Sequence, residues 1–277
     1  MQAPMNPSSP QAEQMADESM VRNLAAQAEA IWPQESRLFA RYHLPENARI
    51  LDLGCGTGEI SLRLAELFPT AQVTGVDLEE AHLRRARERC AALGERVRFQ
   101  VGDALALPFP FASFDLVVCR HVLQAVPSAQ RVVAEIRRVL EAGGVAHLLA
   151  EDYGMLWSHL GALGSDKLWH DGALVFGDAV GTDNRVGRKM FTMLTDFGYE
   201  QILVEYLTID TLRVPRDTIA RIWEAWRDGY SEAMVQRTKL TREEVAALWV
   251  EVIGAARDPR GYAHWSVPIW SARKAAK

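Results

Sequence analysis

The stretch LDLGCGTG, residues 51–58, decides the fold of this chain. It ends an apolar run, ARILDL at residues 48–53, and leads into the helical pattern of residues 57–68. Gly54, Gly56 and Gly58 suit a tight turn in which the backbone approaches a ligand with no Cβ in the way. The spacing is GxGxG, which differs from the GxGxxG fingerprint of dinucleotide binding. The stretch therefore predicts a ligand-binding strand–turn–helix and argues against NAD-dependent redox chemistry.

Beyond this turn, short apolar strands alternate with helical patterns. The predicted strands cover residues 48–53, 72–76, 97–101, 114–119 and 145–150, and the predicted helices cover residues 57–68, 79–93 and 129–140. This alternation is typical of a parallel sheet with helices on both faces. After residue 150 the rhythm breaks. A helix at 186–196, a strand at 201–208, a helical region at 215–257 and a last strand at 263–271 follow.

Acidic residues end the second and third predicted strands. Asp77 stands roughly twenty residues past the glycines, where a carboxylate can accept hydrogen bonds from both hydroxyls of a ribose. Asp103 follows the third strand and can accept a hydrogen bond from an adenine amino group. The fourth strand ends beside the glycine turn. Because these strand ends converge at the switch point of the sheet, we expect the ligand crevice there.

Five motifs in this order resemble the class I S-adenosylmethionine-dependent methyltransferases. They are LDLGCGTG, VTGVD, VGDALALPF, FDLVVCRHVLQAVP and RVLEAGG, spread over residues 47–150. The resemblance is strongest to the branch with ubiquinone/menaquinone-type and other small-molecule enzymes. It implies an α/β, Rossmann-like, doubly wound seven-stranded sheet of order 3-2-1-4-5-7-6 with an antiparallel last strand. It also implies helical lid insertions, at about residues 152–190 and 212–260.

The resemblance further implies S-adenosyl-L-methionine as the cofactor. The residues it assigns to cofactor binding are Asp52, Gly54, Gly56, Gly58, Asp77, Leu78, Asp103, Ala104 and Arg120. The glycines would shape the loop under the methionine part, and Asp52 would position the amino group through that loop. Asp77 would hold the ribose, with Leu78 against the adenine. Residues 103 and 104 would contact the adenine edge, and Arg120 would lie beside the methionine part, mainly through its backbone.

Catalytic residues are harder to assign from the sequence. Methyl transfer is an in-line displacement, so alignment and exclusion of water supply much of the acceleration. A general base is needed only if the acceptor must lose a proton. Many relatives carry a histidine after the fourth strand, but this chain reads Leu-Gln-Ala at 123–125 and has none at 125. His121, one turn earlier, is the candidate base, and a structural histidine is the alternative.

The segment EDY at residues 151–153 follows the fifth strand, at the expected mouth of the crevice. Any of its side chains could bind substrate or take a proton. We take Tyr153 as the second catalytic candidate, with loop solvation as the alternative. His159, His170 and Asp171 could join Glu151 or Asp152 in a metal site. Their spacing fits no known ligand motif, so we predict no metal.

The remaining segments define the expected domain organisation. Residues 1–16 are predicted to be a disordered tail, residues 17–46 an N-terminal helical cap and residues 47–277 the cofactor-binding domain with its lid. Aromatic residues in the cap and lid could form an apolar pocket for the acceptor; packing within the helices is the alternative. These residues are Trp32, Phe39, Tyr42, Trp157, Trp169, Trp223 and Trp226.

Composition excludes several classes of protein. The net charge of −5 and a pI near 5.8 disfavour a nucleic-acid partner. The three cysteines form no CxxC pair, which indicates reduced thiols. Neither a secretory signal nor an apolar run of bilayer length is present, so no membrane partner is expected. We therefore expect a cytoplasmic enzyme acting on a small molecule, and a homodimer stays open.

The predicted activity is transfer of a methyl group to O, N or C of a small metabolite. Two alternatives stay open. The same cofactor site could drive a cyclase or lyase reaction without methylation, because the histidine at 125 is missing. The chain could also be a non-catalytic S-adenosylmethionine-binding partner protein, although the intact glycine loop argues against this.

Overall fold

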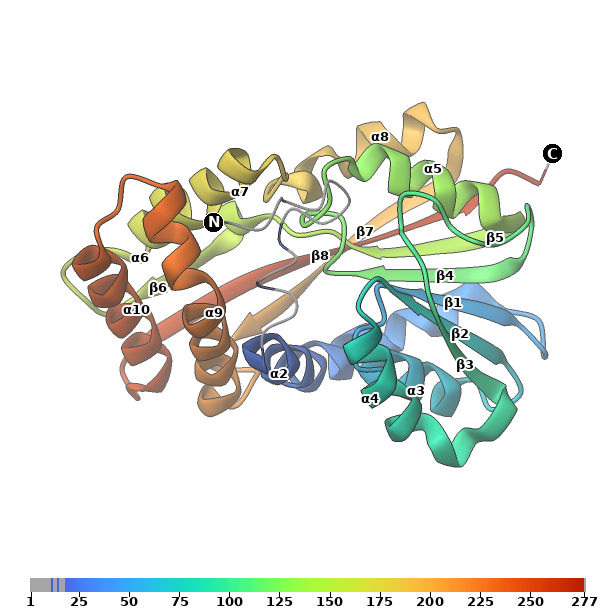
Figure 1. Ribbon diagram of the computed structural model, residues 1–277, viewed down its shortest axis with the longest axis horizontal. Coiled ribbons are helices and arrows are strands. Elements are labelled where there is room, and N and C mark those ends of the chain that lie inside the picture. The colour runs from blue at the N-terminus through green and yellow to red at the C-terminus, as the bar shows by residue number, and fades with distance from the viewer. Residues whose placement is uncertain (1–10, 12–13, 15–17, 277) are drawn as a thin grey trace.

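The structure is a computed structural model that describes residues 11, 14 and 18–276 (Figure 1). Its strands are β1 Arg49–Leu53, β2 Gln72–Asp77, β3 Val97–Val101, β4 Phe114–Arg120, β5 Leu140–Leu149, β6 Leu156–His159, β7 Tyr199–Asp210 and β8 Tyr262–Lys274. Its α-helices are α2 Glu18–Glu35, α3 Glu59–Leu67, α4 Glu80–Cys90, α5 Ala129–Val139, α6 Ser165–Lys167, α7 Val175–Val180, α8 Met190–Asp196, α9 Arg216–Arg237 and α10 Arg242–Arg257. The 3₁₀ segments are η1 Ser36–Tyr42, η2 Ala91–Arg96, η3 Tyr153–Met155 and η5 Val186–Lys189; η4 Leu168–Leu174 is a π-helix.

The sheet confirms the predicted fold class and strand order. Strands β1 to β5 pair in parallel in the order β3-β2-β1-β4-β5, and β8 pairs antiparallel with both β5 and β7. In chain order β7 and β8 are the sixth and seventh strands of the predicted topology. The short strand β6, which pairs with the start of β8, is an addition. It was missed because residues 152–185 show no clear period.

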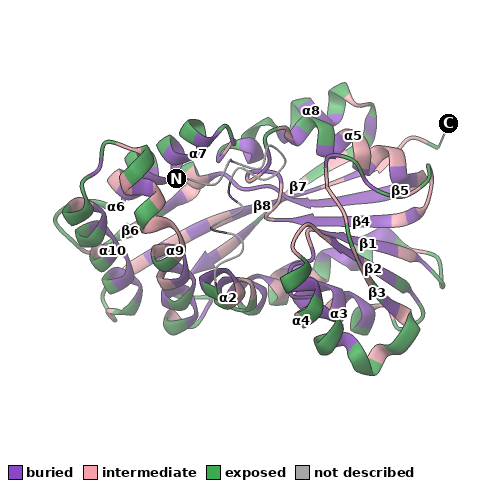
Figure 2. Ribbon diagram, viewed as in Figure 1, coloured by how far each residue is buried: buried purple, intermediate pink, exposed green. Residues whose placement is uncertain are grey.

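Helices cover both faces of the parallel part of the sheet (Figure 1). Helices α3 and α4 lie on one face and helices α5 and α8 on the other. On the α5 face, Val132, Ile136 and Met193 belong to one buried cluster with the sheet. On the opposite face, Ile60 and Leu64 of α3 pack with Phe39 of η1. The central strands β1, β4 and β5 are mostly buried, whereas the outer faces of the helices are exposed (Figure 2).

A third hydrophobic core lies beyond the end of the parallel strands. Here α2, η4, α7, α9 and α10 pack on the long antiparallel strands β7 and β8, and we call these five helices the helical cluster (Figure 1). The core between these helices and the strands contains four fully buried indoles: Trp169, Trp223 and Trp249 of the helical cluster and Trp265 of β8. The helical cluster thus combines residues from all three segments expected to form the cap and lid.

Several predicted boundaries shift for local reasons. The helix expected at 79–93 ends at Cys90 and continues as the 3₁₀ segment η2, in which Gly94 has a φ of +55°. The helix expected at 186–196 divides into η5 and α8, and β5 begins at Leu140 rather than at residue 145.

Residues 1–16, expected to be a disordered tail, lie outside the described residues except for Gln11 and Gln14. Gln11 is buried and donates a hydrogen bond to Thr182 Oγ1.

Candidate active site

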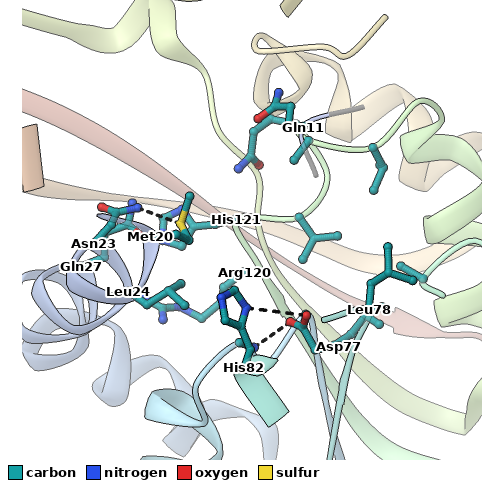
Figure 3. A pocket seen from close by; sticks show the side chains of 18 of the residues that line it. Gln11, Met20, Asn23, Leu24, Gln27, Asp77, Leu78, His82, Arg120 and His121 are labelled. Carbon is teal, nitrogen blue, oxygen red and sulfur yellow. Dashed lines mark hydrogen bonds and ion pairs between the residues drawn. The ribbon is translucent and has the colours of Figure 1, made fainter. Parts of the chain in front are cut away.

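A crevice opens where the parallel strands end, and its empty volume is about 1040 Å³ including the part open to solvent. Seven of the nine predicted cofactor residues line it: Gly54, Gly56, Asp77, Leu78, Asp103, Ala104 and Arg120. His121 and Tyr153 line it as well. Side chains of α2, among them Met20, Asn23 and Gln27, lie opposite Asp77 and Leu78 (Figure 3).

The glycine loop needs glycine for its backbone conformation and for packing. Gly54, Gly56 and Gly58 have φ values of +73°, +51° and +77°, a region that disfavours other residues. A Cβ on Gly56 would lie 2.6 Å from Leu24 Cδ1, and a Cβ on Gly58 would lie 2.9 Å from Ala86 Cβ. At Gly58 the closest atoms therefore belong to helix α4. Gly58 does not line the crevice, so its expected contact with the cofactor stays a prediction.

Asp77 lies at the carboxyl end of β2 and is fixed by two backbone donors. The amide of Gly56 donates to its Oδ2 at 2.8 Å, and the amide of Glu79 donates to its Oδ1 at 3.0 Å. Each carboxylate oxygen can accept a further hydrogen bond. His82 Nδ1 lies 4.0 Å from Asp77 Oδ1 (Figure 3). This arrangement ties the glycine loop to the acidic residue expected to hold a ribose.

Two other predicted acids carry structural hydrogen bonds. Asp103 Oδ1 accepts a hydrogen bond from the Leu105 amide at 2.8 Å, so it caps its own loop and lines the crevice as well. Asp52 is buried behind the loop, where its Oδ2 accepts a 2.6 Å hydrogen bond from Ser61 Oγ. Burial raises the pKa of Asp52 to about 6, because the charged form loses its hydration. Asp52 therefore supports the loop from behind.

The Arg120 side chain is more deeply placed than the resemblance implied. Its Nε lies 2.9 Å from Oε1 of Glu35, a fully buried residue at the end of α2. His147 Nε2 lies 2.9 Å from the same oxygen, and Tyr42 Oη lies 2.6 Å from His147 Nδ1. Despite its burial, the pKa of Glu35 is lowered by Arg120 and His147. Arg120 Nη2 has no hydrogen-bond partner among the described residues.

His121 pairs with the buried carboxylate of Glu151. Its Nδ1 lies 2.7 Å from Glu151 Oε1, and Trp265 Nε1 donates to the other carboxylate oxygen at 3.2 Å. With Nδ1 as the donor to Glu151 Oε1, Nε2 is the ring nitrogen left to accept a proton. That Nε2 is buried without a partner among the described residues. His121 also has a φ of +57°, an uncommon conformation that occurs at functional sites.

The two residues that follow Glu151, Asp152 and Tyr153, have different surroundings. Arg188 donates to both oxygens of buried Asp152, at 2.6 and 2.8 Å, and this pairing anchors the loop rather than binding a ligand. Tyr153 lines the crevice and packs edge-on against Trp226, with ring centroids 5.7 Å apart. Burial raises the pKa of Tyr153 well above its ordinary value. Its phenol therefore suits hydrogen-bond donation and not proton abstraction.

The metal ligands and aromatic residues considered in the sequence analysis have different outcomes in the structure. Among the described residues, no group of three or more His, Cys, Asp and Glu is arranged to hold a metal. Of the aromatic residues expected in the cap and lid, Trp226 reaches the crevice, whereas Phe39 and Tyr42 pack around His147.

Sequence reasoning missed Glu35 and His82, because helical patterns gave no sign that either side chain faces the sheet ends. No helix in the described part of the chain is long and apolar enough to cross a bilayer.

Comparison with known proteins supports the resemblance stated from the sequence. Residues 50–144 match the family described as methyltransferase domain. A demethylmenaquinone methyltransferase from Thermus thermophilus is 43% identical over 96 residues, which is 35% of this chain and 44% of that protein. The chain thus matches less than half of this relative's length. The similarity to class I S-adenosylmethionine-dependent methyltransferases is confirmed over this region.

Solved structures share the fold over nearly the whole chain. The [4+2]-cyclase SpnF superposes with a TM-score of 0.60 and 22% identity, covering 100% of both chains. A phosphoethanolamine N-methyltransferase 2 of Haemonchus contortus, in complex with S-adenosyl-L-methionine, has a TM-score of 0.58 and 19% identity. That match covers 95% of this chain and 60% of the other. At these identities the likeness establishes the fold alone.

Proposed function

We propose that this protein transfers a methyl group from S-adenosylmethionine to a small molecule, at a hydroxyl or another group that loses a proton. The observation that carries this proposal is the His121–Glu151 pair beside a glycine-loop crevice. The methyltransferase-domain match over residues 50–144 supports the cofactor. The pair supports a reaction in which proton removal accompanies transfer, since an imidazole held by a buried carboxylate is suited to general-base catalysis.

The residues around the crevice fit the cofactor. Asp77 offers acceptor positions for ribose hydroxyls, and Leu78 with Ala104 offers apolar surface for the adenine. We assign Arg120 a side-chain role, because its buried Nη2 lacks a partner and a carboxylate is the usual partner of a guanidinium. The carboxylate of the methionine part would provide that partner. When bound, S-adenosylmethionine supplies a methyl carbon activated by the adjacent sulfonium.

The side chains of the described residues provide a place for the proton that the acceptor loses. Nε2 of His121 would take the proton as the acceptor's O–H bond breaks and its oxygen bonds to the methyl carbon. The bond between that carbon and the sulfonium sulfur would break in the same step, with S-adenosylhomocysteine as the leaving group. Glu151 stabilises the resulting imidazolium, and Trp265 keeps the carboxylate in place. General bases of this kind contribute a factor of about 10² to 10⁴ in rate. Tyr153 is proposed as a hydrogen-bond donor that orients the acceptor.

The proposal also covers partners and location. We take the acceptor to be a small molecule and not a nucleic acid, because the site is a cavity in a protein of net charge −5. We place the protein in the cytoplasm, where its three buried free cysteines would stay reduced. A homodimer is compatible with the proposal but is not required by it.

A reaction without methyl transfer is the second candidate. Gln124 and Ala125 line the crevice where many relatives carry histidine, and a cyclase shares the fold. Incubation with S-adenosylmethionine and an extract of small metabolites separates the two reactions. Release of S-adenosylhomocysteine with a product heavier by one methyl group supports methyl transfer. Release of methylthioadenosine, or turnover of the metabolite alone, supports the cyclase or lyase.

A further inference from the structure

A second cavity adjoins the crevice on the side of the helical cluster. Its empty volume is about 390 Å³ including its open part. Four residues line both spaces: Gln11, Tyr153, Trp226 and Tyr230. The two spaces therefore adjoin, and the second cavity lies next to the space that the His121–Glu151 pair lines.

The wall of the second cavity is aromatic and uncharged among the described residues. Its lining beyond the shared residues consists of Trp169, Ala173, Phe176, Asn184, Met234 and Trp249. No Asp, Glu, Lys, Arg or His of the described chain contributes to it. An ion placed here would lose its hydration without gaining a counter-ion, which is costly. The wall therefore selects for an uncharged occupant.

Three buried polar atoms of this wall lack hydrogen-bond partners among the described residues. They are Nε1 of Trp169, Nε1 of Trp249 and Oδ1 of Asn184. The Asn184 amide nitrogen donates to the Ala173 carbonyl at 2.7 Å, which leaves only its oxygen unpaired. Buried polar groups are rarely left unpaired in folded proteins. An occupant with an oxygen acceptor would satisfy an indole N–H, and a hydroxyl on it would satisfy Asn184.

A chain of aromatic contacts connects this wall to the proposed base. Trp265, which donates to Glu151, packs against Trp226 with ring centroids 5.5 Å apart. Trp226 packs in turn against Trp169 at 6.1 Å, and Trp169 packs against Trp249 at 5.8 Å. The residues that would hold the acceptor therefore pack continuously with those that hold the base.

We propose that the second cavity binds the body of the methyl acceptor, and that this body is electrically neutral, largely apolar, and carries at least one hydrogen-bond-accepting oxygen. The inference rests on the proposed function for the identity of the occupant as acceptor. It adds a substrate class: neutral ring or chain compounds with carbonyl, ester or ether oxygens, as opposed to phosphorylated or carboxylated acceptors.

Equilibrium dialysis of the full-length protein against three probes tests this proposal. The probes are coumarin, which is neutral with a carbonyl, naphthalene, which is neutral without one, and the anion 2-naphthoate. Saturating S-adenosylhomocysteine keeps the cofactor crevice filled, so that the probes report the second cavity. We expect coumarin to bind most tightly and 2-naphthoate at least tenfold more weakly than either neutral probe.

Three variants locate the binding. Ala173→Phe fills the cavity and should weaken coumarin binding at least tenfold, whereas Ala247→Phe on the exposed face of α10 is the matched control and should not. Trp249→Phe removes the indole N–H and keeps a smaller aromatic ring, so coumarin binding should fall several-fold more than naphthalene binding. If Ala173→Phe lowers the melting temperature strongly, Met234→Trp replaces it as the filling variant.

Two results would overturn the proposal. One is binding of 2-naphthoate as tight as that of coumarin, and the other is equal probe affinity in the filling variant and Ala247→Phe. Failure of the proposed function has a different signature. In that case no methylated product forms with S-adenosylmethionine, whether or not S-adenosylhomocysteine binds, while the probes still rank as described and still respond to Ala173→Phe.

Discussion

Nδ1 of His121 lies 2.7 Å from Oε1 of Glu151, although these residues follow two different strands. The two are brought together because β4 and β5 pair in parallel, with Arg120 opposite Leu149, so that their carboxyl ends coincide. The buried Trp265 indole completes the arrangement from the antiparallel strand β8. The sheet topology thus builds a carboxylate–imidazole pair at the edge of the cofactor crevice.

Removal of this pair should abolish most activity without affecting cofactor binding. We expect His121→Asn to lower kcat by about 10² to 10⁴, because the proposed base is lost. Glu151→Gln should lower kcat as well, since it weakens stabilisation of the imidazolium. Glu141→Gln, a half-exposed carboxylate paired with Arg49, is the matched control. Steady-state kinetics with calorimetric titration of S-adenosylhomocysteine makes the test, and normal kcat in His121→Asn would return this histidine to a structural role.

Loss of Asp77 should weaken cofactor binding. Asp77→Ala removes both the proposed ribose contact and the acceptor of the Gly56 amide, so the Kd for S-adenosylhomocysteine should rise about 10- to 100-fold, or roughly 1.4 to 2.8 kcal/mol. Asp115→Ala is the control, because Asp115 accepts from the Arg49 amide at the opposite end of the sheet. It should lower stability and leave the Kd unchanged. Equal Kd values for Asp77→Ala and the unmodified protein would remove the ribose assignment.

The glycine loop and helix α2 should be energetically coupled. Gly56→Ala places a Cβ 2.6 Å from Leu24 Cδ1 and forces alanine into a φ of +51°. We expect a loss of about 1–3 kcal/mol in unfolding free energy, from backbone strain and overpacking. The double variant Gly56→Ala/Leu24→Ala should lose less than the sum of the single losses, because the clash is removed. Strictly additive losses in chemical denaturation would show that α2 does not press on the loop.

Asp52 should make stability depend on pH in a defined direction. Burial raises its pKa to about 6 from an ordinary 3.8, so the folded state binds its proton more tightly than the unfolded state. Its contribution is therefore most favourable below about pH 4 and is lost as the pH rises towards 6. Two pKa units correspond to about 3 kcal/mol. The unfolding free energy of Asp52→Asn relative to the unmodified protein should increase by this order between pH 4 and 7, and a pH-independent difference would contradict the assignment.

Local features of the fold could be predicted from the sequence. The strand expected at 97–101 is β3, and the glycine turn and Asp77 lie together at the crevice. These predictions succeed because hydrophobic alternation, turn glycines and strand-end acids are encoded within a few neighbouring residues. The strand order followed from the family resemblance, since pairing between distant strands is not visible in local patterns.

The long-range parts of the site could not be predicted. Glu35 lies on a helix that gave no reason to join it to Arg120, and Trp169 and Trp249 meet only because η4 and α10 pack together. Strand β6 was hidden in a segment without clear period. Tyr153 was taken as a catalytic candidate because it follows a strand, but its burial in an aromatic setting favours a donor role. Each depends on tertiary packing, which a single sequence does not display.

The central claim is methyl transfer from S-adenosylmethionine in this crevice, and isotope transfer tests it most directly. Protein is incubated with S-adenosylmethionine carrying a trideuterated methyl group and an extract of neutral, apolar metabolites, with His121→Asn as the control. We predict a product that carries the trideuteromethyl group, formed in equal amount to S-adenosylhomocysteine and strongly reduced in the variant. Turnover of a metabolite with no deuterium in the product, or release of labelled methylthioadenosine, would contradict the account.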